Sequence, residues 1–311
     1  MRYVPEMMGA RPRHLFTIDV EDYFHSEDPD PAGWDRHELR VEASTRAVLD
    51  CCAATGARGT FFVLGWVAER CPQLVREIAA AGHEVASHGS DHRFVYRQSR
   101  SEFLDDVRRA RDLLSGITGT AVQGYRAPYF SIVASTPWAH DVLLEAGYSY
   151  SSSVFPGANP RYGIPGASSE PGMIPTPGGR SMLEIPITTF FSRVGCGGVY
   201  FRALPYALFR AGIAARERGG RRAVFYLHPW ELDSGKPSPR GSVWLRMRHD
   251  VGIRGARARL ERLLRDFEFE SVESFLARES GLARSPGAGS TPSILRRSTL
   301  PAPALVQEAR R

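Results

Sequence analysis

Short apolar runs alternate with segments of helical periodicity along most of the chain. Gly59–Leu64 is typical of a buried strand, and Ser101–Leu114 carries apolar residues at the spacing of one helix face. Further strands are expected at 15–22, 83–87, 122–125, 183–187 and 223–228, and further helices at 42–54, 73–81, 137–146, 205–216 and 252–264. This alternation predicts an α/β protein built around a parallel sheet.

Two segments interrupt this pattern. Residues 155–180 contain six prolines among many glycines, so we expect a long loop without regular elements that lies near the site and shapes access to it. From Ala283 on, Pro, Gly, Ser and Arg dominate, which predicts a disordered basic tail over 283–311. Residues 1–282 are then expected to form one domain.

The positive charge of the chain lies mainly in this tail. The 311 residues carry a formal net charge of +6, with a pI near 9.3. Residues 283–311 hold five arginines and one glutamate, a net +4, which leaves +2 for the rest of the chain. Such a tail is typical of a solvated segment. The sequence contains no basic motif with interleaved aromatic residues, so we expect no nucleic-acid partner.

The cysteines and the lengths of the apolar runs bear on location. Cys51, Cys52, Cys71 and Cys196 form no C-x-x-C pair and are expected to be reduced thiols. No apolar stretch typical of a secretory signal follows Met1–Arg13, and no run approaches the roughly 20 apolar residues of a membrane span. We therefore expect a cytoplasmic protein that meets its substrate there or at the inner face of the membrane.

Polar residues follow several of the expected strands, where they suggest chemistry. They are Asp19, Glu21 and Asp22 at the end of the first strand, His88 and His92 after 83–87, Arg126 and Tyr129 after 122–125, and His228 at the end of 223–228. Because the carboxyl ends of parallel strands meet at one edge, one site is expected there. Two histidines at this spacing and one carboxylate can supply three ligands of a catalytic metal, with water as the fourth.

Taken in chain order, these motifs resemble those of the polysaccharide deacetylases of the NodB-homology group, carbohydrate esterase family 4. Thr17–Asp22 resembles the acidic motif, the two histidines match the metal-binding pair, Arg126–Tyr129 matches Arg-x-Pro-Tyr, and Leu227–His228 matches the final motif. The flanks Asp22–His25 and His228–Asp233 are similar to the branch found with exosortase-linked exopolysaccharide clusters. The resemblance covers roughly residues 12 to 280 and implies an irregular (β/α)7 barrel.

The resemblance also implies a role for each candidate residue. Asp19 is the implied general base, and the Arg126 guanidinium can orient it through a charge-assisted pair. Pro128 stiffens the backbone so that the N–H of Tyr129 can face a developing oxyanion. His228 is the implied general acid.

His88 and His92 are the implied metal ligands, and the third ligand is Glu21 or Asp22. The usual motif has two adjacent aspartates, whereas this chain has Asp-Val-Glu-Asp. Glu21 lies on the same face as Asp19 by the period of two along a strand, while Asp22 is favoured if the chain turns there. The metal is expected to be Zn²⁺, with Co²⁺ or Mn²⁺ as alternatives.

One position departs from the family pattern. Relatives tend to have Tyr-Asp-Ser-Ser where this chain has Tyr150–Ser153, so Ser151 stands in the place of an expected aspartate. In the family that aspartate supports the histidine of the last motif. Its absence bears on the tuning of His228 and not on the metal site.

These observations predict a metal-dependent N-deacetylase acting on an N-acetylated polysaccharide, specifically an exopolysaccharide, or on its precursor, a lipid-linked oligosaccharide. A related C–N hydrolase of small linear or cyclic amides would share the same residues, because the fold does not fix the substrate. A degenerate, non-catalytic sugar-binding protein is the second alternative, motivated by Ser151. The retained Asp19, His88, His92 and His228 argue against it.

Overall fold

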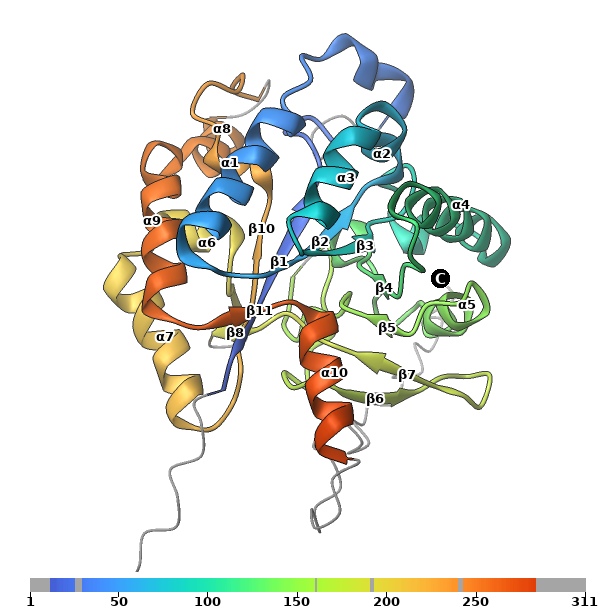
Figure 1. Ribbon diagram of the computed structural model, residues 1–311. Helices are drawn as coiled ribbons and strands as arrows, with labels where there is room; N and C mark the ends of the chain where they lie inside the picture. Colours follow the sequence, from blue (N-terminus) through green and yellow to red (C-terminus); the bar gives the residue numbers. More distant parts are fainter. Residues whose placement is uncertain (1–11, 26–29, 160, 191–192, 240–242, 284–311) are drawn as a thin grey trace, which may run out of the picture.

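The computed structural model describes residues 12–25, 30–159, 161–190, 193–239 and 243–283. Figure 1 shows a curled sheet whose outer side is covered by helices. Within the described part of the chain, no helix is long and apolar enough to cross a membrane.

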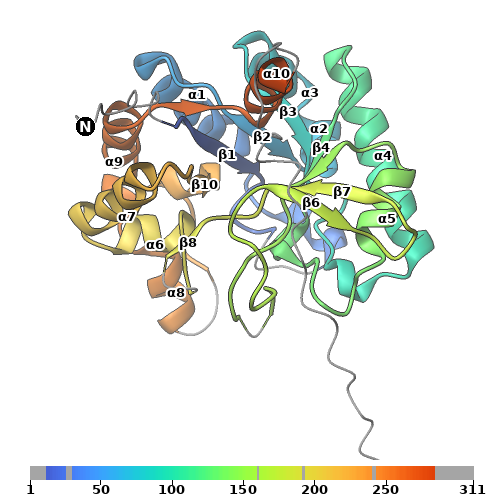
Figure 2. The same cartoon turned by 90° about the horizontal axis from the view of Figure 1, so that it is seen from below.

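One nine-stranded sheet contains most of the strands. Its members are β1 (His14–Val20), β2 (Thr60–Val63), β3 (Glu84–Ser87), β4 (Gly124–Tyr125), β5 (Tyr150–Ser151), β6 (Gly172–Pro175), β7 (Ser181–Glu184), β10 (Val224–Leu227) and β11 (Phe269–Glu270). In the order β10-β1-β2-β3-β4-β5-β7-β6, the seven strands from β10 to β7 are parallel and β6 is antiparallel to β7, while β11 pairs with β1. Figure 2 shows this order as an arc. A separate hairpin joins β8 (Thr189–Phe190) and β9 (Val194–Gly195).

Helices connect the strands and flank the sheet. They are α1 (Val41–Thr55), α2 (Gly65–Arg70), α3 (Pro72–Ala80), α4 (Arg100–Thr118), α5 (Ala139–Glu145), α6 (Gly198–Ala203), α7 (Tyr206–Arg218), α8 (Val243–Asp250), α9 (Ile253–Asp266) and α10 (Val272–Ala283). Four short 3-10 helices span Pro31–Arg36, Val95–Arg97, Pro128–Phe130 and Pro229–Leu232. The helix ends have local causes: Pro72 opens α3, and Gly56 ends α1 in the left-handed conformation that glycine adopts without a steric cost.

The curled sheet does not close through strand pairing alone. Between β7 and β10, Thr188 N–H donates to Val224 O (3.4 Å), Cys196 N–H donates to Thr188 O (2.8 Å), and Tyr226 N–H donates to Cys196 O (3.0 Å). The central strands β1 and β2 are buried on both faces, which suits the mainly apolar sequence of β2. The predicted fold class, an irregular barrel of alternating strands and helices, is confirmed.

Two predictions outside the regular pattern have different outcomes. The expectation of a loop without elements over 155–180 is wrong, because 172–175 forms β6. This strand lies at the edge of the sheet. The N–H group that Pro175 lacks is therefore not needed for a hydrogen bond to a further strand. The predicted tail, from 284 on, lies outside the described residues. The four cysteines are buried and unpaired, in agreement with reduced thiols.

Candidate active site and metal centre

The strand register brings the predicted residues to one level of the sheet edge. The last residues of β1, β2, β3 and β4 are paired neighbours. Glu21, His88 and Arg126 follow three of these ends directly, so they lie side by side. His228 follows β10 at the level of Asp19, because Leu227 pairs with the residue before Asp19. The predicted gathering of polar residues at the carboxyl ends of the strands is therefore observed.

Glu21, His88 and His92 form a buried cluster at this edge. The Glu21 carboxylate lies 2.5 Å from His92 Nε2 and 3.7 Å from His88 Nε2. The other ring nitrogens face backbone carbonyls: His88 Nδ1 lies 2.9 Å from Arg126 O, and His92 Nδ1 lies 3.2 Å from His25 O. Since a carbonyl oxygen can only accept, this arrangement suits a proton on Nδ1 of each ring, which would leave Nε2 able to bind a metal beside the carboxylate.

Three acceptor atoms thus converge on one buried space, and they lie within 4.8 Å of one another. Glu21 Oε2 has no hydrogen-bond donor among the described residues. Acceptors that face one another in the interior are costly unless a cation lies between them. Two imidazole nitrogens and one carboxylate oxygen also form the ligand set of a catalytic zinc site with an open position. These residues therefore fit a divalent metal.

Asp22 lies outside this cluster because the chain turns after β1. Its Oδ1 accepts the N–H of Tyr23 (2.9 Å), and its Oδ2 accepts the N–H groups of Arg40 (2.7 Å) and Val41 (2.8 Å) at the start of α1. Burial raises the pKa of Asp22 to about 6, although these N–H groups oppose the rise. Of the two acids that the sequence leaves open, the structure brings Glu21 to the histidines, whereas Asp22 caps a helix.

Asp19 is held in the interior by Arg126. The Nη1 of Arg126 donates to Asp19 Oδ1 (2.7 Å) and Thr17 Oγ1 (2.9 Å), while Nε and Nη2 donate to the carbonyl and hydroxyl oxygens of Ser152 (3.1 and 2.8 Å). The exposed fraction of the side chain is 0% for Arg126 and 3% for Asp19. The pair fixes one carboxylate oxygen of Asp19 and leaves Oδ2 facing His228 Nε2 at 3.9 Å.

His228 has a carboxylate on each side of its ring. Its Nδ1 lies 2.8 Å from Glu231 Oε1, and its Nε2 lies 3.8 Å from Glu21 Oε1. Burial lowers the pKa of His228, but the Glu231 hydrogen bond and the charges of Glu21, Glu231 and Asp19 outweigh burial and raise it to about 9. The side chain is 22% exposed, more than that of Asp19 or Glu21, so this is the open side of the site.

The backbone beside the cluster is strained. His92 has φ 50° and Tyr129 has φ 57°, a left-handed region that costs free energy for residues other than glycine. Tyr129 Oη donates to His25 O (3.0 Å), and its ring stacks on Phe94 with a centroid separation of 4.1 Å. These contacts hold the strained turn in place. The oxyanion role of the Tyr129 N–H stays a prediction.

Three residues outside the predicted set support the site. The carbonyl oxygen of His25 orients His92 and Tyr129, a backbone contact that the sequence does not indicate. Asp106 on α4 accepts two backbone N–H groups from the loop between the two histidines, at 3.1 and 3.3 Å, and it has no local signal. Glu231 lies in the flank His228–Asp233, three residues after the last motif histidine and at the spacing of a capping box, so the sequence offers it as a partner of His228.

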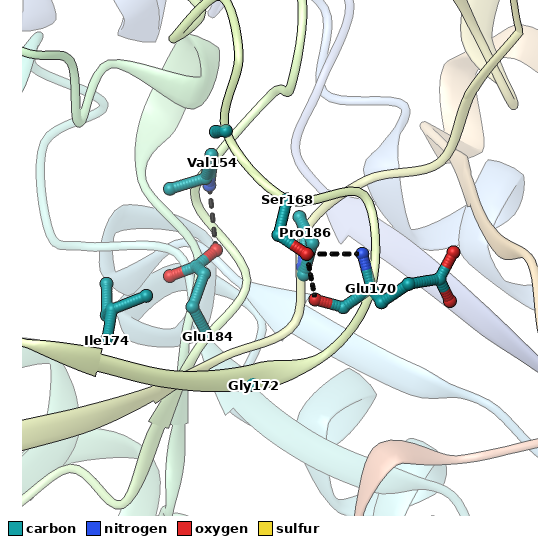
Figure 3. Close-up of a pocket in the computed structure, with 8 residues that line it drawn as sticks. Val154, Ser168, Glu170, Gly172, Ile174, Glu184 and Pro186 are labelled. Carbon is teal, nitrogen blue, oxygen red and sulfur yellow. Dashed lines mark hydrogen bonds between the residues drawn. The ribbon is translucent and has the colours of Figure 1, made fainter. Parts of the chain in front are cut away.

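A small pocket by β6 and β7 is lined by none of the candidate site residues. Figure 3 shows Glu184 pointing to the backbone of Val154, near the contact of Ser168 with Glu170. Its volume is about 10 Å³, roughly the space of one water molecule. Glu184 accepts the Val154 N–H (2.8 Å) and lies 3.1 Å from His140 Nε2. Glu184 and His140 therefore make structural contacts.

Comparison with known proteins divides the chain into two matched segments. Residues 32–151 match the family model described as polysaccharide deacetylase, and residues 152–277 match a domain of unknown function, DUF3473. A chitooligosaccharide deacetylase of Sinorhizobium fredii is 33% identical over 118 residues, which cover 38% of this chain and 52% of that protein. A peptidoglycan-N-acetylglucosamine deacetylase of Bacillus cereus is 29% identical over 96 residues, covering 30% and 35%. The chain thus spans about a third to a half of the length of these relatives.

Solved structures share the fold over most of the chain. A Mycobacterium smegmatis protein assigned to the polysaccharide deacetylases has a TM-score of 0.63 at 22% identity and covers 91% of this chain and 94% of its own. Puue allantoinase has a TM-score of 0.53 at 17% identity, covering 85% and 91%.

The curled parallel barrel, with a carboxylate and two histidines at its strand ends, defines an α/β protein with a candidate metal centre. Its first segment is similar to the polysaccharide deacetylase family model and to parts of the curated deacetylases. The site uses residues from both matched segments: His88 and His92 lie in the first, and His228 lies in the second.

Proposed function

We propose that this protein is a metal-dependent hydrolase that removes acetyl groups from N-acetylated sugars. The observation that carries the proposal is the approach of Asp19 and Glu21 to His228 Nε2, at 3.9 and 3.8 Å, beside the histidine pair. A base, a set of metal ligands and an acid then surround a space where one amide bond could react. The deacetylase family match supports the same reaction.

The candidate ligands fit a divalent ion, and Zn²⁺ is expected, with Co²⁺ and Mn²⁺ as alternatives. Bound by Glu21, His88 and His92, it would polarise the acetamide carbonyl and lower the pKa of water.

Asp19 and His228 carry out the two proton transfers. Arg126 holds Oδ1 of Asp19, so Oδ2 accepts the proton of the attacking water. The N–H of Tyr129 stabilises the negative charge on the former carbonyl oxygen. His228 then donates the Nε2 proton to the leaving nitrogen, and the products are a free amine and acetate.

The proposed substrate is an N-acetylated exopolysaccharide or its lipid-linked precursor. The support is the likeness of the flanks Asp22–His25 and His228–Asp233 to the exosortase-associated branch. The names of the relatives describe related substrates, chitooligosaccharide and the N-acetylglucosamine of peptidoglycan.

Acetate release from N-acetylated oligosaccharides tests the reaction. The purified protein, supplied with Zn²⁺, should release acetate and leave a product lighter by one acetyl group in mass spectrometry. His88→Ala and His92→Ala should lose bound metal and acetate release, while circular dichroism stays unchanged because the barrel core does not depend on the ion. Full metal content in both variants would contradict the assigned ligands, and undiminished acetate release in them would contradict the dependence on the metal. No acetate release from the wild type would contradict the reaction.

A second candidate function is the hydrolysis of a small linear or cyclic amide, which the same metal ligands, base and acid could perform because the fold does not fix the substrate. Allantoin and other small amides, offered to the same preparation, separate the two. Turnover of a small amide without acetate release would favour this candidate. Sugar binding with no turnover of either kind would favour a non-catalytic protein.

A further inference from the structure

His228 is held by a carboxylate from its own segment. Glu231 is fully buried, and its Oε1 accepts hydrogen bonds from the backbone N–H of His228 (3.1 Å) and from Nδ1 of the same ring (2.8 Å). Both bonds arise because the 3-10 helix Pro229–Leu232 brings residue 231 back over residue 228. The second oxygen, Oε2, accepts Nε of Arg202 at 2.6 Å.

Arg202, on α6, cannot easily turn away from Glu231. Its Nη1 donates to the carbonyl oxygens of His249 and Val251, and its Nη2 donates to the carbonyl oxygen of Arg248. The side chain is 1% exposed, so these bonds hold the guanidinium in the interior. Its charge also compensates that of Glu231, which makes a buried carboxylate tolerable at this place.

The His228 ring is also restrained across its face. It stacks on Trp230 with a centroid separation of 5.4 Å and an interplanar angle of 19°, and Trp230 stacks in turn on His249 at 5.1 Å and 11°. Stacking alone does not distinguish Nδ1 from Nε2. Among the described residues, the bond to Glu231 makes this distinction and so decides which nitrogen faces Asp19.

Ser151 does not supply this contact. Its hydroxyl donates to Ser153 Oγ at 2.9 Å, on β5. The carboxylate on the His228 ring comes instead from residue 231, in the segment that matches the domain of unknown function.

We propose that Glu231, itself held by Arg202, is the positioning residue that fixes the ring orientation of His228 and keeps its Nδ1 protonated. The inference rests on the proposed function, in which Nε2 of His228 delivers a proton. With Nδ1 bonded to Glu231, the mobile proton of the ring is confined to Nε2, which faces Asp19.

Nuclear magnetic resonance of the whole protein labelled with ¹⁵N-histidine tests the contact without any turnover. The His228 signals are identified by their loss in His228→Asn. At alkaline pH, where the ring has lost one proton, the wild type should show a single form protonated on Nδ1. Glu231→Ala should show exchange between the two tautomers, whereas Glu231→Gln, whose amide oxygen still accepts, should keep the Nδ1 form.

Steady-state kinetics of the same variants should show a change in kcat without a change in KM. Glu231→Ala should lower kcat on the order of 10²-fold, the lower end of what an acid–base group contributes, with KM and bound metal unchanged. Glu231→Gln should lose less. Asp233→Asn is the matched control, because Asp233 lies two residues further on and pairs with Arg40; it should leave both the tautomer and kcat as in the wild type.

Glu231→Ala leaves the buried Arg202 without its ion-pair partner, so this variant should be destabilised. If it does not fold, Glu231→Leu combined with Arg202→Met removes both charges, and the same tautomer exchange is expected. A single Nδ1 form in these variants, with kcat retained, overturns the proposal while acetate release still upholds the deacetylase function. Tautomer exchange in a protein that releases no acetate upholds the positioning role and rejects the function.

Discussion

Replacing Arg126 by methionine should destabilise the protein far more than replacing a surface arginine that makes an equally short ion pair. Arg126 binds Asp19 at 2.7 Å with both side chains buried, and its guanidinium also lies 4.2 Å from the centroid of the Phe62 ring. Met fills part of the volume but donates nothing. The Asp19 carboxylate would then stay in the interior without the cation that is hydrogen-bonded to it.

The magnitude follows from the burial of the pair. Removing one partner of a buried ion pair costs about 3–5 kcal/mol, since the remaining charge is uncompensated. Arg109 is the matched control. It pairs with Asp91 at 2.6 Å, but the two side chains are 54% and 36% exposed. Arg109→Met should therefore cost only about 0–1 kcal/mol.

Urea denaturation of the single and double variants measures both effects. In Arg126→Met combined with Asp19→Asn, neither member of this pair carries a charge, so the second substitution should restore about 1–3 kcal/mol of the free energy of unfolding. If Arg126→Met costs no more than Arg109→Met, the carboxylate is not held by this pair in solution. If the two substitutions are additive, Arg126 acts through other contacts, such as those to Ser152.

Three further predictions concern the chemistry of the site. Glu21→Gln should lose bound metal in elemental analysis, whereas Asp22→Asn should keep it and lower the free energy of unfolding by about 1 kcal/mol as a weakened helix cap; the reverse pattern of metal loss would exchange the two roles. Asp19→Asn should retain metal and lose on the order of 10²–10⁴-fold in kcat, and a near wild-type kcat would place the base elsewhere. Because a general acid must be protonated, kcat/KM should fall as the pH rises through the pKa of His228, about 9. Glu231→Gln removes a charge that raises this pKa, so the alkaline limb of the profile should move to lower pH, and an unmoved limb would show that another group titrates there.

The structure also changes what is expected of Ser151→Asp. From the sequence, a restored carboxylate at this position should raise the pKa of His228 and move the alkaline limb upward, provided that no other acid serves the ring. Glu231 already occupies Nδ1 at 2.8 Å. The substitution should therefore leave the limb in place, which the same pH profile checks.

The fold was readable from the sequence where the periodicity was unambiguous. Ser101–Leu114 lies within α4, and Gly59–Leu64 contains β2, because each has one dominant period and a clear stop. β6 could not be read in this way. It is short, ends in Pro175 and gains its hydrogen bonds from a hairpin with β7 at the edge of the sheet, so its stability depends on a partner and not on its own residues.

The sequence by itself determined the composition of the candidate site: Asp19, the pair His88 and His92, Arg126 and His228, each next to a strand end. Parallel strands have their carboxyl ends at one edge of the sheet. Residues that are distant in the chain can therefore be predicted to lie close together there. It could not decide between neighbouring acids, because a turn after β1 sends adjacent side chains to different partners.

Only the tertiary structure decided those choices. It placed Glu21 against the histidines and Asp22 on the N-terminus of α1, and it supplied Arg202 to Glu231 from α6. The physical reason is that orientation and charge compensation in a buried site depend on three-dimensional neighbours, which strand register and helix docking bring together irrespective of their distance along the chain.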